Sequence, residues 1–217
     1  MVAIDQILSF MVLGVRVHLV QMNQVLSIIE RWVDQGGGCR YIVATQMHGI
    51  MEARRDARFK EILNSADLFV PDGFSLSLAA RLRRIELKKR VPGPDLCLEG
   101  CRLAAERGYR VFFYGDTEET LAALVFSLKD RFPNLEIAGT HSPPFRPLTE
   151  EEDALETAMI NGSGADIVWV GLGLPKQERW MFAHREMLNA SVLVGVGAAF
   201  KFMSGQVRRA PPWVGDH

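Results

Sequence analysis

The sequence predicts an α/β protein whose open, mainly parallel sheet carries helices on both faces. Short β-rich apolar runs alternate with amphipathic helical patterns along the 217 residues. Such alternation implies right-handed βαβ crossovers, which place helices against the faces of a parallel sheet. The run IVWV at 167–170 is continuous and apolar, as in a strand buried on both faces. The pattern therefore indicates a Rossmann-like fold, with strands expected at residues 15–20, 40–44, 68–70, 110–114, 135–138, 167–170 and 192–195.

Two of the helical patterns have ends that can be predicted. Apolar residues between Met22 and Val33 follow helical spacing, and the glycines at 36–38 end that helix. Four acids follow Thr149 and fall in a first helical turn, where the helix dipole favours negative charge. Ligands of open α/β sheets bind beyond the carboxyl ends of the strands, so the loops after the strands are where a site is expected.

Composition limits the class of protein. The length fits one domain over residues 1–217, and a net charge of −1 gives no reason to expect a nucleic-acid partner. Three cysteines argue against a disulfide framework and for a reducing cytoplasm. Cys97 and Cys101 lie one helical turn apart, and we expect them to face the core rather than bind a metal. No apolar stretch is long enough to cross a bilayer, so any membrane contact is expected to be peripheral.

A glycine-rich turn follows the sixth expected strand. Gly171 and Gly173 would let the backbone approach a ligand closely, and Pro175 suits the first position of the next helix. Amide groups at that helix start would face an anion, with Lys176 and Gln177 as neighbouring donors. An ordinary βα turn that binds nothing explains the same residues equally well.

Asp72 stands between Pro71 and Gly73, directly after the third expected strand. A carboxylate held in a stiff turn at this edge is well placed to act as a general base. The alternative is an N-cap on a helix expected over residues 75–82, and on position alone the cap is the commoner role.

Other polar residues follow the strands. The loop after the second expected strand holds Thr45 and Gln46. Arg90 ends a basic run over residues 81–90, which is either a solvated helix face or a contact for anionic lipid or pyrophosphate. The prolines that follow Arg90 fix its backbone, so its guanidinium could bind phosphate in a bidentate way.

Several catalytic motifs are absent from the sequence. It contains no Gly-x-Ser-x-Gly elbow, no Walker Gly-Lys-Ser/Thr, no His-Glu-x-x-His and no complete Gly-x-Gly-x-x-Gly. Their absence argues against a serine hydrolase, a P-loop enzyme, a zinc protease and a standard dehydrogenase.

Four segments together resemble the WecG/TagA/CpsF family of bacterial glycosyltransferases. They are ADLFVPDG at 66–73, RVPGPDL at 90–96, GLGLPKQERW at 171–180, and GVGAAF at 195–200 continuing to RAPPW at 209–213. Their order and spacing match the family from about Gly14 to Trp213. Each segment alone is weak, but four in register are specific.

The resemblance implies an activity. Family members transfer a sugar, commonly of the N-acetylmannosamine type, from a UDP-sugar to a sugar on a polyprenyl-pyrophosphate carrier. The products feed cell-surface polysaccharides such as wall teichoic acid. Transfer inverts the anomeric carbon and requires no metal or other cofactor. The expected location is the cytoplasmic face of the membrane, with peripheral contact.

The resemblance also implies roles for the residues at the strand ends. Asp72 matches the general base, which favours the catalytic role over the cap. Arg90 matches an arginine near the pyrophosphate leaving group, and Gln177 matches a glutamine of the donor pocket. The other residues expected to bind substrate are Thr45, Gln46, Gly171, Gly173 and Lys176.

The chain departs from the family pattern in three places. Ala44-Thr45-Gln46 stands where many members have Thr-x-Asn, and Lys201 stands where an aspartate is usual. The chain ends at His217, where members usually continue into a helical appendage that aids membrane docking. A truncated or naturally short protein is expected to bind membranes less well and to be less active. The oligomeric state stays open, and apolar surface exposed by a missing appendage could promote self-association. These departures keep two alternatives open: a different sugar, or a catalytically silent sugar-nucleotide-binding subunit. A Rossmann-type dehydrogenase is a third.

Overall fold

The computed structural model describes residues 7–73, 76, 78, 80, 84–85 and 90–207 of the 217-residue chain. The expected helix at 75–82 and the basic run at 81–90 lie largely outside these residues, and the 209–213 segment lies wholly outside them.

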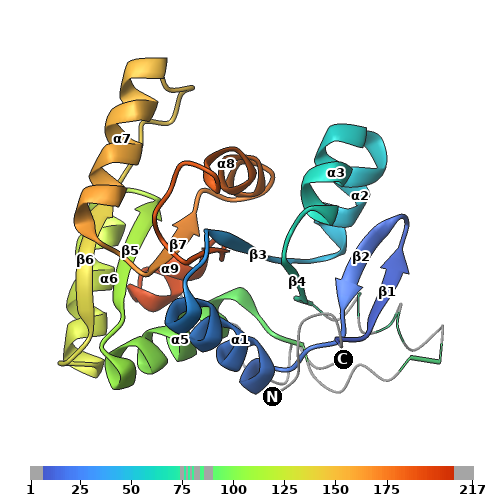
Figure 1. Cartoon of the computed structure of the whole chain (residues 1–217), viewed down its shortest axis with the longest axis horizontal. Coiled ribbons are helices and arrows are strands. Elements are labelled where there is room, and N and C mark those ends of the chain that lie inside the picture. Colours follow the sequence, from blue (N-terminus) through green and yellow to red (C-terminus); the bar gives the residue numbers. More distant parts are fainter. Residues whose placement is uncertain are drawn as a thin grey trace.

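A six-stranded parallel sheet forms the centre of the molecule (Figure 1). Its strands are β3 (Arg40–Thr45), β4 (Leu68–Pro71), β5 (Arg110–Gly115), β6 (Glu136–His141), β7 (Ile167–Gly171) and β8 (Val192–Gly195). They are arranged in the order β4-β3-β8-β7-β5-β6, and every pairing is parallel. The predicted α/β fold class is confirmed.

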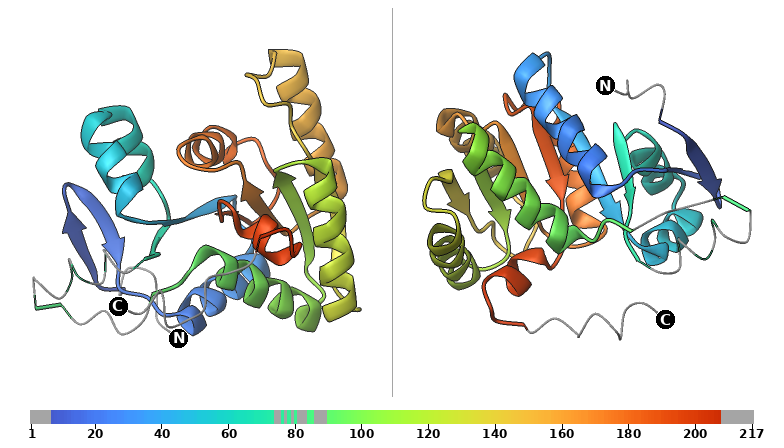
Figure 2. Two further views of the ribbon diagram at one scale, coloured as in Figure 1. Left: turned by 180° about the vertical axis from the view of Figure 1, so that it is seen from behind. Right: turned by 90° about the horizontal axis from the view of Figure 1, so that it is seen from below.

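Helices cover both faces of this sheet (Figure 2). They are α1 (Met22–Gln35), α2 (Met47–Arg55), α3 (Ala57–Asn64), α5 (Gly93–Arg107), α6 (Glu118–Arg131), α7 (Glu150–Ser163), α8 (Lys176–His184) and α9 (Ala199–Met203). One buried apolar cluster joins the sheet to α1, α5, α6 and α9. A second cluster joins the opposite face to α2, α3, α7 and α8. The core therefore consists of two layers, and the carboxyl edge of the sheet lies between them.

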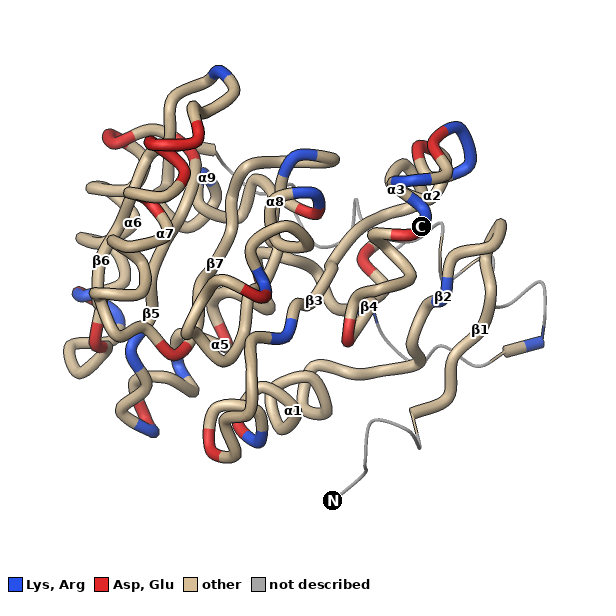
Figure 3. Tube along the Cα trace, turned by 45° about the horizontal axis from the view of Figure 1, so that its top comes forward, with Lys and Arg blue, Asp and Glu red and all other residues tan. Residues whose placement is uncertain are grey.

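The two helix ends predicted from sequence are confirmed. Helix α1 stops at Gly36, whose φ of 61° lies in the left-handed region that favours glycine. Before α7, the Thr149 hydroxyl accepts the Glu152 N–H at 3.2 Å, and the Glu152 carboxylate accepts the Thr149 N–H at 2.9 Å. This reciprocal capping satisfies two amides that have no partner inside the helix. The first turns of α6 and α7 both contain acidic residues, which are coloured red along the trace in Figure 3.

The first expected strand does not join the main sheet. Residues 15–20 were expected to form one strand, but β2 (Val15–His18) pairs antiparallel with β1 (Ser9–Val12) in a separate hairpin beside β4. The sequence did not predict β1, because Leu13 occupies the turn at a φ of 50°. Asparagine, aspartate or glycine is usual at such a position, so leucine gives no turn signal.

One strand of the main sheet is displaced from its expected position. The sequence predicts residues 135–138, and the structure has Glu136–His141. This strand lies at the edge of the sheet and is only partly buried, so its second half lacks the apolar run on which the prediction relied.

Two cysteine thiols lie where the sequence predicts them. Cys97 and Cys101 are buried in α5 as free thiols, which confirms that they belong to the core. Within the described ranges, no helix combines the length and the apolar character needed to cross a membrane.

Candidate active site

The loops after four neighbouring strands meet at the carboxyl edge of the sheet. Strand register brings their ends within two residues of one another, through the pairs Thr45–Pro71, Val43–Gly195 and Val170–Gly195. The polar residues that follow β4, β3, β8 and β7 therefore lie in one row, as the parallel topology predicts.

Asp72 is held from two sides immediately after β4. Its backbone N–H donates to the Thr45 carbonyl at 3.3 Å, which fixes it against the end of β3. Its carboxylate Oδ2 accepts the N–H of Gly93, the first residue of α5, at 3.3 Å. A negative charge at the start of a helix is favoured by the helix dipole. Asp72 therefore caps a helix, but the helix is α5, which begins 21 residues later.

Arg90 lies beside the same strand end. The N–H of the next residue, Val91, donates to the Pro71 carbonyl at 3.0 Å. The chain around Arg90 therefore runs along the end of β4, which brings its backbone close to that of Asp72. Both side chains are partly exposed. The structure thus brings together the predicted base and the predicted phosphate ligand.

Gln46 completes this group from the end of β3. It is exposed, and its side-chain carbons lie 3.2–3.5 Å from the point that a Cβ on Gly73 would occupy. Gly73 has a φ of 99°, so glycine is required there by conformation as well as by this contact.

Thr45 is buried rather than open to the loops. Its Oγ1 lies 2.6 Å from the point that a Cβ on Gly49 would occupy, and the Leu174 side chain lies 2.7 Å from the same point. The turn between β7 and α8 therefore packs directly on the start of α2. Thr45 lies underneath this contact.

The turn after β7 differs from the sequence prediction in two respects. Pro175 occupies the cap position, so α8 begins one residue later, at the exposed Lys176. A Cβ on Gly171 would lie 2.6 Å from the Phe200 ring, so a core side chain fills the space where a ligand was expected. Gly173 has a φ of 74° and open space beside it. Of the two glycines, only Gly173 therefore leaves room for close approach.

Gln177 is almost completely buried, and both ends of its amide are engaged within the chain. Its Oε1 accepts the Gly197 N–H at 2.9 Å, and its Nε2 donates to Glu178 Oε1 at 2.9 Å. The side chain thus ties the start of α8 to the turn after β8. This placement connects two loops of the site.

Lys201 lies at the β5 end of the same edge. Its Nζ is 4.0 Å from Oδ1 of Asp116, which directly follows β5 and has a φ of 59°. The lysine that replaces the usual aspartate is therefore paired with an acid of this chain. Its positive charge stays at the edge of the site.

Residues 10–217 match the glycosyl transferase WecG/TagA/CpsF family. The chain belongs to this family. The match covers both the fold and every loop of the carboxyl edge described above.

Three bacterial relatives of the WecG/TagA/CpsF glycosyltransferase share one name, N-acetylglucosaminyldiphosphoundecaprenol N-acetyl-beta-D-mannosaminyltransferase. The protein from Bacillus spizizenii is 33% identical over 192 residues, which cover 88% of this chain and 72% of the relative. The protein from Bacillus subtilis is 30% identical over 195 residues, covering 89% and 73%. The protein from Staphylococcus aureus is 28% identical over 201 residues, covering 92% and 77%.

These comparisons decide between the classes left open by the sequence. The WecG/TagA/CpsF chain is a glycosyltransferase, because its relatives are named as transferases. The comparisons therefore favour a transferase over a catalytically silent binding subunit or a dehydrogenase. Among the described residues, no three or more His, Cys, Asp or Glu side chains come together in a way that could hold a metal ion.

Sequence reasoning missed two residues of this site. Gly93 supplies the N–H that holds Asp72, and Glu178 supplies the acceptor that holds Gln177. Gly93 has a signal in hindsight, since it lies between two prolines, a residue type that is common in the first turn of a helix. Glu178 has none, because an acid in a first helical turn is usually exposed.

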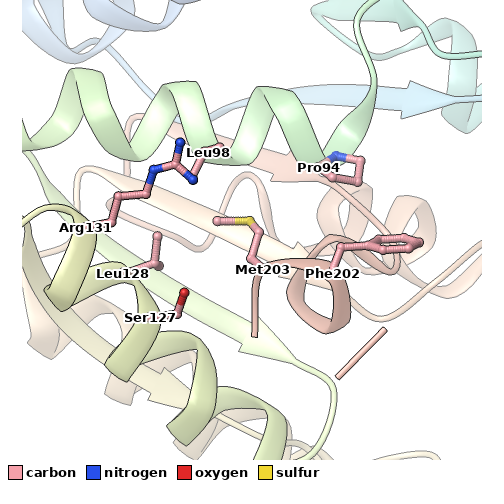
Figure 4. A pocket seen from close by; sticks show the side chains of 7 residues that line it. All are labelled: Pro94, Leu98, Ser127, Leu128, Arg131, Phe202 and Met203. Carbon is pink, nitrogen blue, oxygen red and sulfur yellow. The ribbon is translucent and has the colours of Figure 1, made fainter. Parts of the chain in front are cut away.

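A cavity of about 220 Å³ lies away from these residues, between α5, α6 and α9 (Figure 4). Its lining residues are Pro94, Leu98, Ser127, Leu128, Arg131, Phe202 and Met203. The described residues that line it include none of the predicted site residues and no carboxylate that could act as a base.

Proposed function

We propose that this glycosyltransferase transfers an N-acetylmannosamine-type sugar from a UDP-sugar to N-acetylglucosamine on a polyprenyl diphosphate. The names of the relatives support the sugar and the acceptor. The observation that carries the proposal is the Asp72 carboxylate, fixed at the carboxyl edge by the Gly93 N–H with Arg90 beside it. The proposed transfer needs no metal and inverts the anomeric carbon.

The proposed reaction is a single displacement. The acceptor hydroxyl attacks the anomeric carbon from the face opposite the diphosphate, while Asp72 takes the hydroxyl proton. The bond between the anomeric carbon and the diphosphate oxygen breaks, and UDP leaves with the bonding electrons. Arg90 and the start of α8 near Lys176 stabilise the negative charge that develops on the leaving group.

The remaining predicted residues form the proposed donor site around this step. Gln46 and Gly173 border the open part of the edge, while Thr45, Gly171 and Gln177 shape it from below. The acceptor carries a polyprenyl chain, so the enzyme is proposed to act in the cytoplasm as a peripheral protein at the membrane surface. Self-association remains part of this proposal.

The base is tested by Asp72→Asn, with Asp130→Asn on the exposed surface of α6 as the matched control. We expect the site variant to lose at least about 100-fold in kcat, because the amide cannot accept the proton. UDP affinity should stay within about threefold, since only the proton acceptor is altered. Normal turnover of Asp72→Asn would show that Asp72 serves only to hold α5.

The donor site is tested by calorimetric titration with UDP, first without divalent metal and then with magnesium. Binding without metal that weakens about tenfold or more in Arg90→Ala would support the proposed leaving-group contact. Binding that requires magnesium would contradict the metal-free part of the proposal.

A further inference from the structure

Glu178 is a fully buried carboxyl group with one unsatisfied oxygen. Its Oε1 accepts the Gln177 Nε2 hydrogen at 2.9 Å, whereas its Oε2 has no hydrogen-bond partner. A buried polar atom without a partner is costly and calls for a physical reason. Among the described side chains, the carboxyl group bonds only to Gln177, whose orientation it therefore influences.

The Gln177 amide can satisfy its neighbours in one orientation only. Its oxygen faces the Gly197 N–H, and its nitrogen faces Glu178. A flipped amide would point an NH₂ group at the Gly197 N–H and an oxygen at the carboxyl oxygen. The side chain also lies tightly on β8, because a Cβ on Gly195 would come within 3.2 Å of Nε2. Glu178 thus selects the amide orientation that holds the turn after β8.

This turn in turn contacts the start of α5. The main chain of Val196 lies 3.1–3.6 Å from the point that a Cβ on Gly93 would occupy. The Gly93 N–H is the donor that holds Asp72 Oδ2. A continuous series of contacts therefore runs from Glu178 through Gln177, the β8–α9 turn and Gly93 to Asp72.

We propose that Glu178 is a positioning residue for the transfer reaction, which sets Asp72 through Gln177, the β8–α9 turn and the start of α5. The proposal rests on the proposed role of Asp72 as the base. It assigns a function to a buried group that does not reach the substrate, and it makes Gln177 part of the same positioning unit.

The protonation state of Glu178 gives this unit a pH dependence. Burial raises the pKa of Glu178 to about 7, and the hydrogen bond from Gln177 opposes that rise. Helix α8 packs against α3, β3 and β8. The charged side chains of those elements are Arg58, Lys60 and Glu61 of α3 and Arg40 of β3. At the other end of α8, His184 pairs with Asp153 of α7. None of these groups contributes to the shift in the pKa of Glu178. Ionisation above pH 7 would place an uncompensated charge beneath the turn and disturb the alignment of Asp72.

The test compares the full chain with Glu178→Gln, Glu178→Leu and a control, Glu186→Gln, at a largely exposed carboxylate just after α8. Glu178→Gln keeps a neutral acceptor. We expect the transfer rate of Glu178→Gln at pH 6.5 to stay within about threefold of the wild-type rate. Between pH 6.5 and 8.5 the rate of the variant should stay constant, whereas the wild-type rate should decline. Glu178→Leu removes the acceptor, so kcat should fall about 10- to 100-fold, as a small misplacement of the base does. Leucine removes the unsatisfied Oε2 but leaves the buried Gln177 Nε2 without its acceptor, so we expect the melting temperature to fall slightly. UDP affinity should fall less than kcat, because only the position of the base depends on the whole series of contacts.

Amide hydrogen exchange at Gly197 and Gly93 provides a readout that does not depend on catalysis. Exchange at Gly197 should be at least about tenfold faster in Glu178→Leu and unchanged in Glu178→Gln and Glu186→Gln. Wild-type kcat together with wild-type exchange in Glu178→Leu would overturn the proposal. If instead Asp72→Asn turned over normally, the base assignment would fail, and the exchange data would still decide whether Glu178 holds the turn.

Discussion

At the scale of single residues, some glycines at the carboxyl edge are required because a side chain would collide with a neighbouring residue. A Cβ on Gly171 would meet the Phe200 ring, and a Cβ on Gly115 would lie 2.6 Å from the main chain of Gly171. The ends of β5 and β7 therefore approach each other more closely than a side chain would allow. This close packing is sufficient by itself to require glycine at position 171.

Gly171→Ala tests this explanation against Gly162→Ala. We expect Gly171→Ala to lower the free energy of unfolding by about 1–3 kcal/mol, because the methyl group would displace the Phe200 ring. Gly162 lies in α7 with no atom within 4 Å of the added Cβ, so alanine there should stabilise the helix by up to about 1 kcal/mol. Urea unfolding measures both, and equal stability of the two variants would contradict the packing argument.

The site residues that sequence could predict are those that follow strands. Asp72, Gln46 and Lys176 could be placed at one edge because the carboxyl ends of parallel strands lie together. The groups that hold them could not be predicted, because the partners come from distant segments. Gly93 contacts Asp72 across 21 residues, and Gly197 contacts Gln177 across 20. Such contacts depend on tertiary packing, which the local pattern does not encode.

At the scale of elements, a buried carboxylate of α7 is hydrogen-bonded to a stack of aromatic rings from β5 and α8. Tyr114 of β5 stacks on Trp180 of α8 with ring centroids 4.3 Å apart, and Trp180 stacks on His184 at 4.4 Å. Buried Glu156 of α7 accepts the Tyr114 hydroxyl at 2.5 Å and contacts His141 Nε2 at 2.9 Å. Two layers of the structure are thus joined by one buried carboxylate.

Tyr114→Phe measures the contribution of this connection, and Tyr109→Phe is its matched control. Removing the Tyr114 hydroxyl leaves the buried Glu156 with one donor fewer, which should cost about 1–3 kcal/mol of unfolding free energy. Tyr109 also donates to a carboxylate, but Asp34 is exposed and water can replace the lost donor. Removing the Tyr109 hydroxyl should therefore lower the free energy of unfolding by less than about 1 kcal/mol. Equal losses in chemical denaturation would show that Glu156 does not depend on Tyr114.

Elements differed in how well the sequence predicted them. All six strands of the main sheet were predicted, because most are apolar runs buried on both faces. The hairpin β1–β2 was not predicted as such, since Leu13 at its turn is not a turn-forming residue. Strand β6 was displaced because an edge strand needs less apolar sequence. The signals failed where tertiary packing, rather than local pattern, decides the structure.

For the whole molecule, buried groups rather than surface pairs should decide how stability depends on pH. Glu152 pairs with Arg146 at 2.7 Å, and this contact lowers the pKa of Glu152 to about 2, but both side chains are exposed. Exposed pairs contribute little to stability. Two buried groups act in opposite directions. Burial lowers the pKa of His18, so the contribution of His18 to the free energy of unfolding is lost as the pH falls below about 6.5. Burial raises the pKa of Glu178, so the contribution of Glu178 is lost as the pH rises.

Glu178→Gln isolates the second of these contributions. Because the pKa of Glu178 rises from 4.5 to about 7 on folding, the folded protein holds this proton more tightly than the unfolded chain. The wild type therefore loses stability as the pH rises from about 4.5 to 7, by up to about 3 kcal/mol, and the loss stays constant above pH 7. Glutamine does not titrate, so the stability difference between variant and wild type should grow over that window. Glu152→Gln should show no such change between pH 5 and 8, because its carboxylate is already ionised there in both states. A constant difference for Glu178→Gln in guanidinium unfolding at pH 5, 6, 7 and 8 would mean that the carboxyl group of Glu178 reaches water in the folded protein.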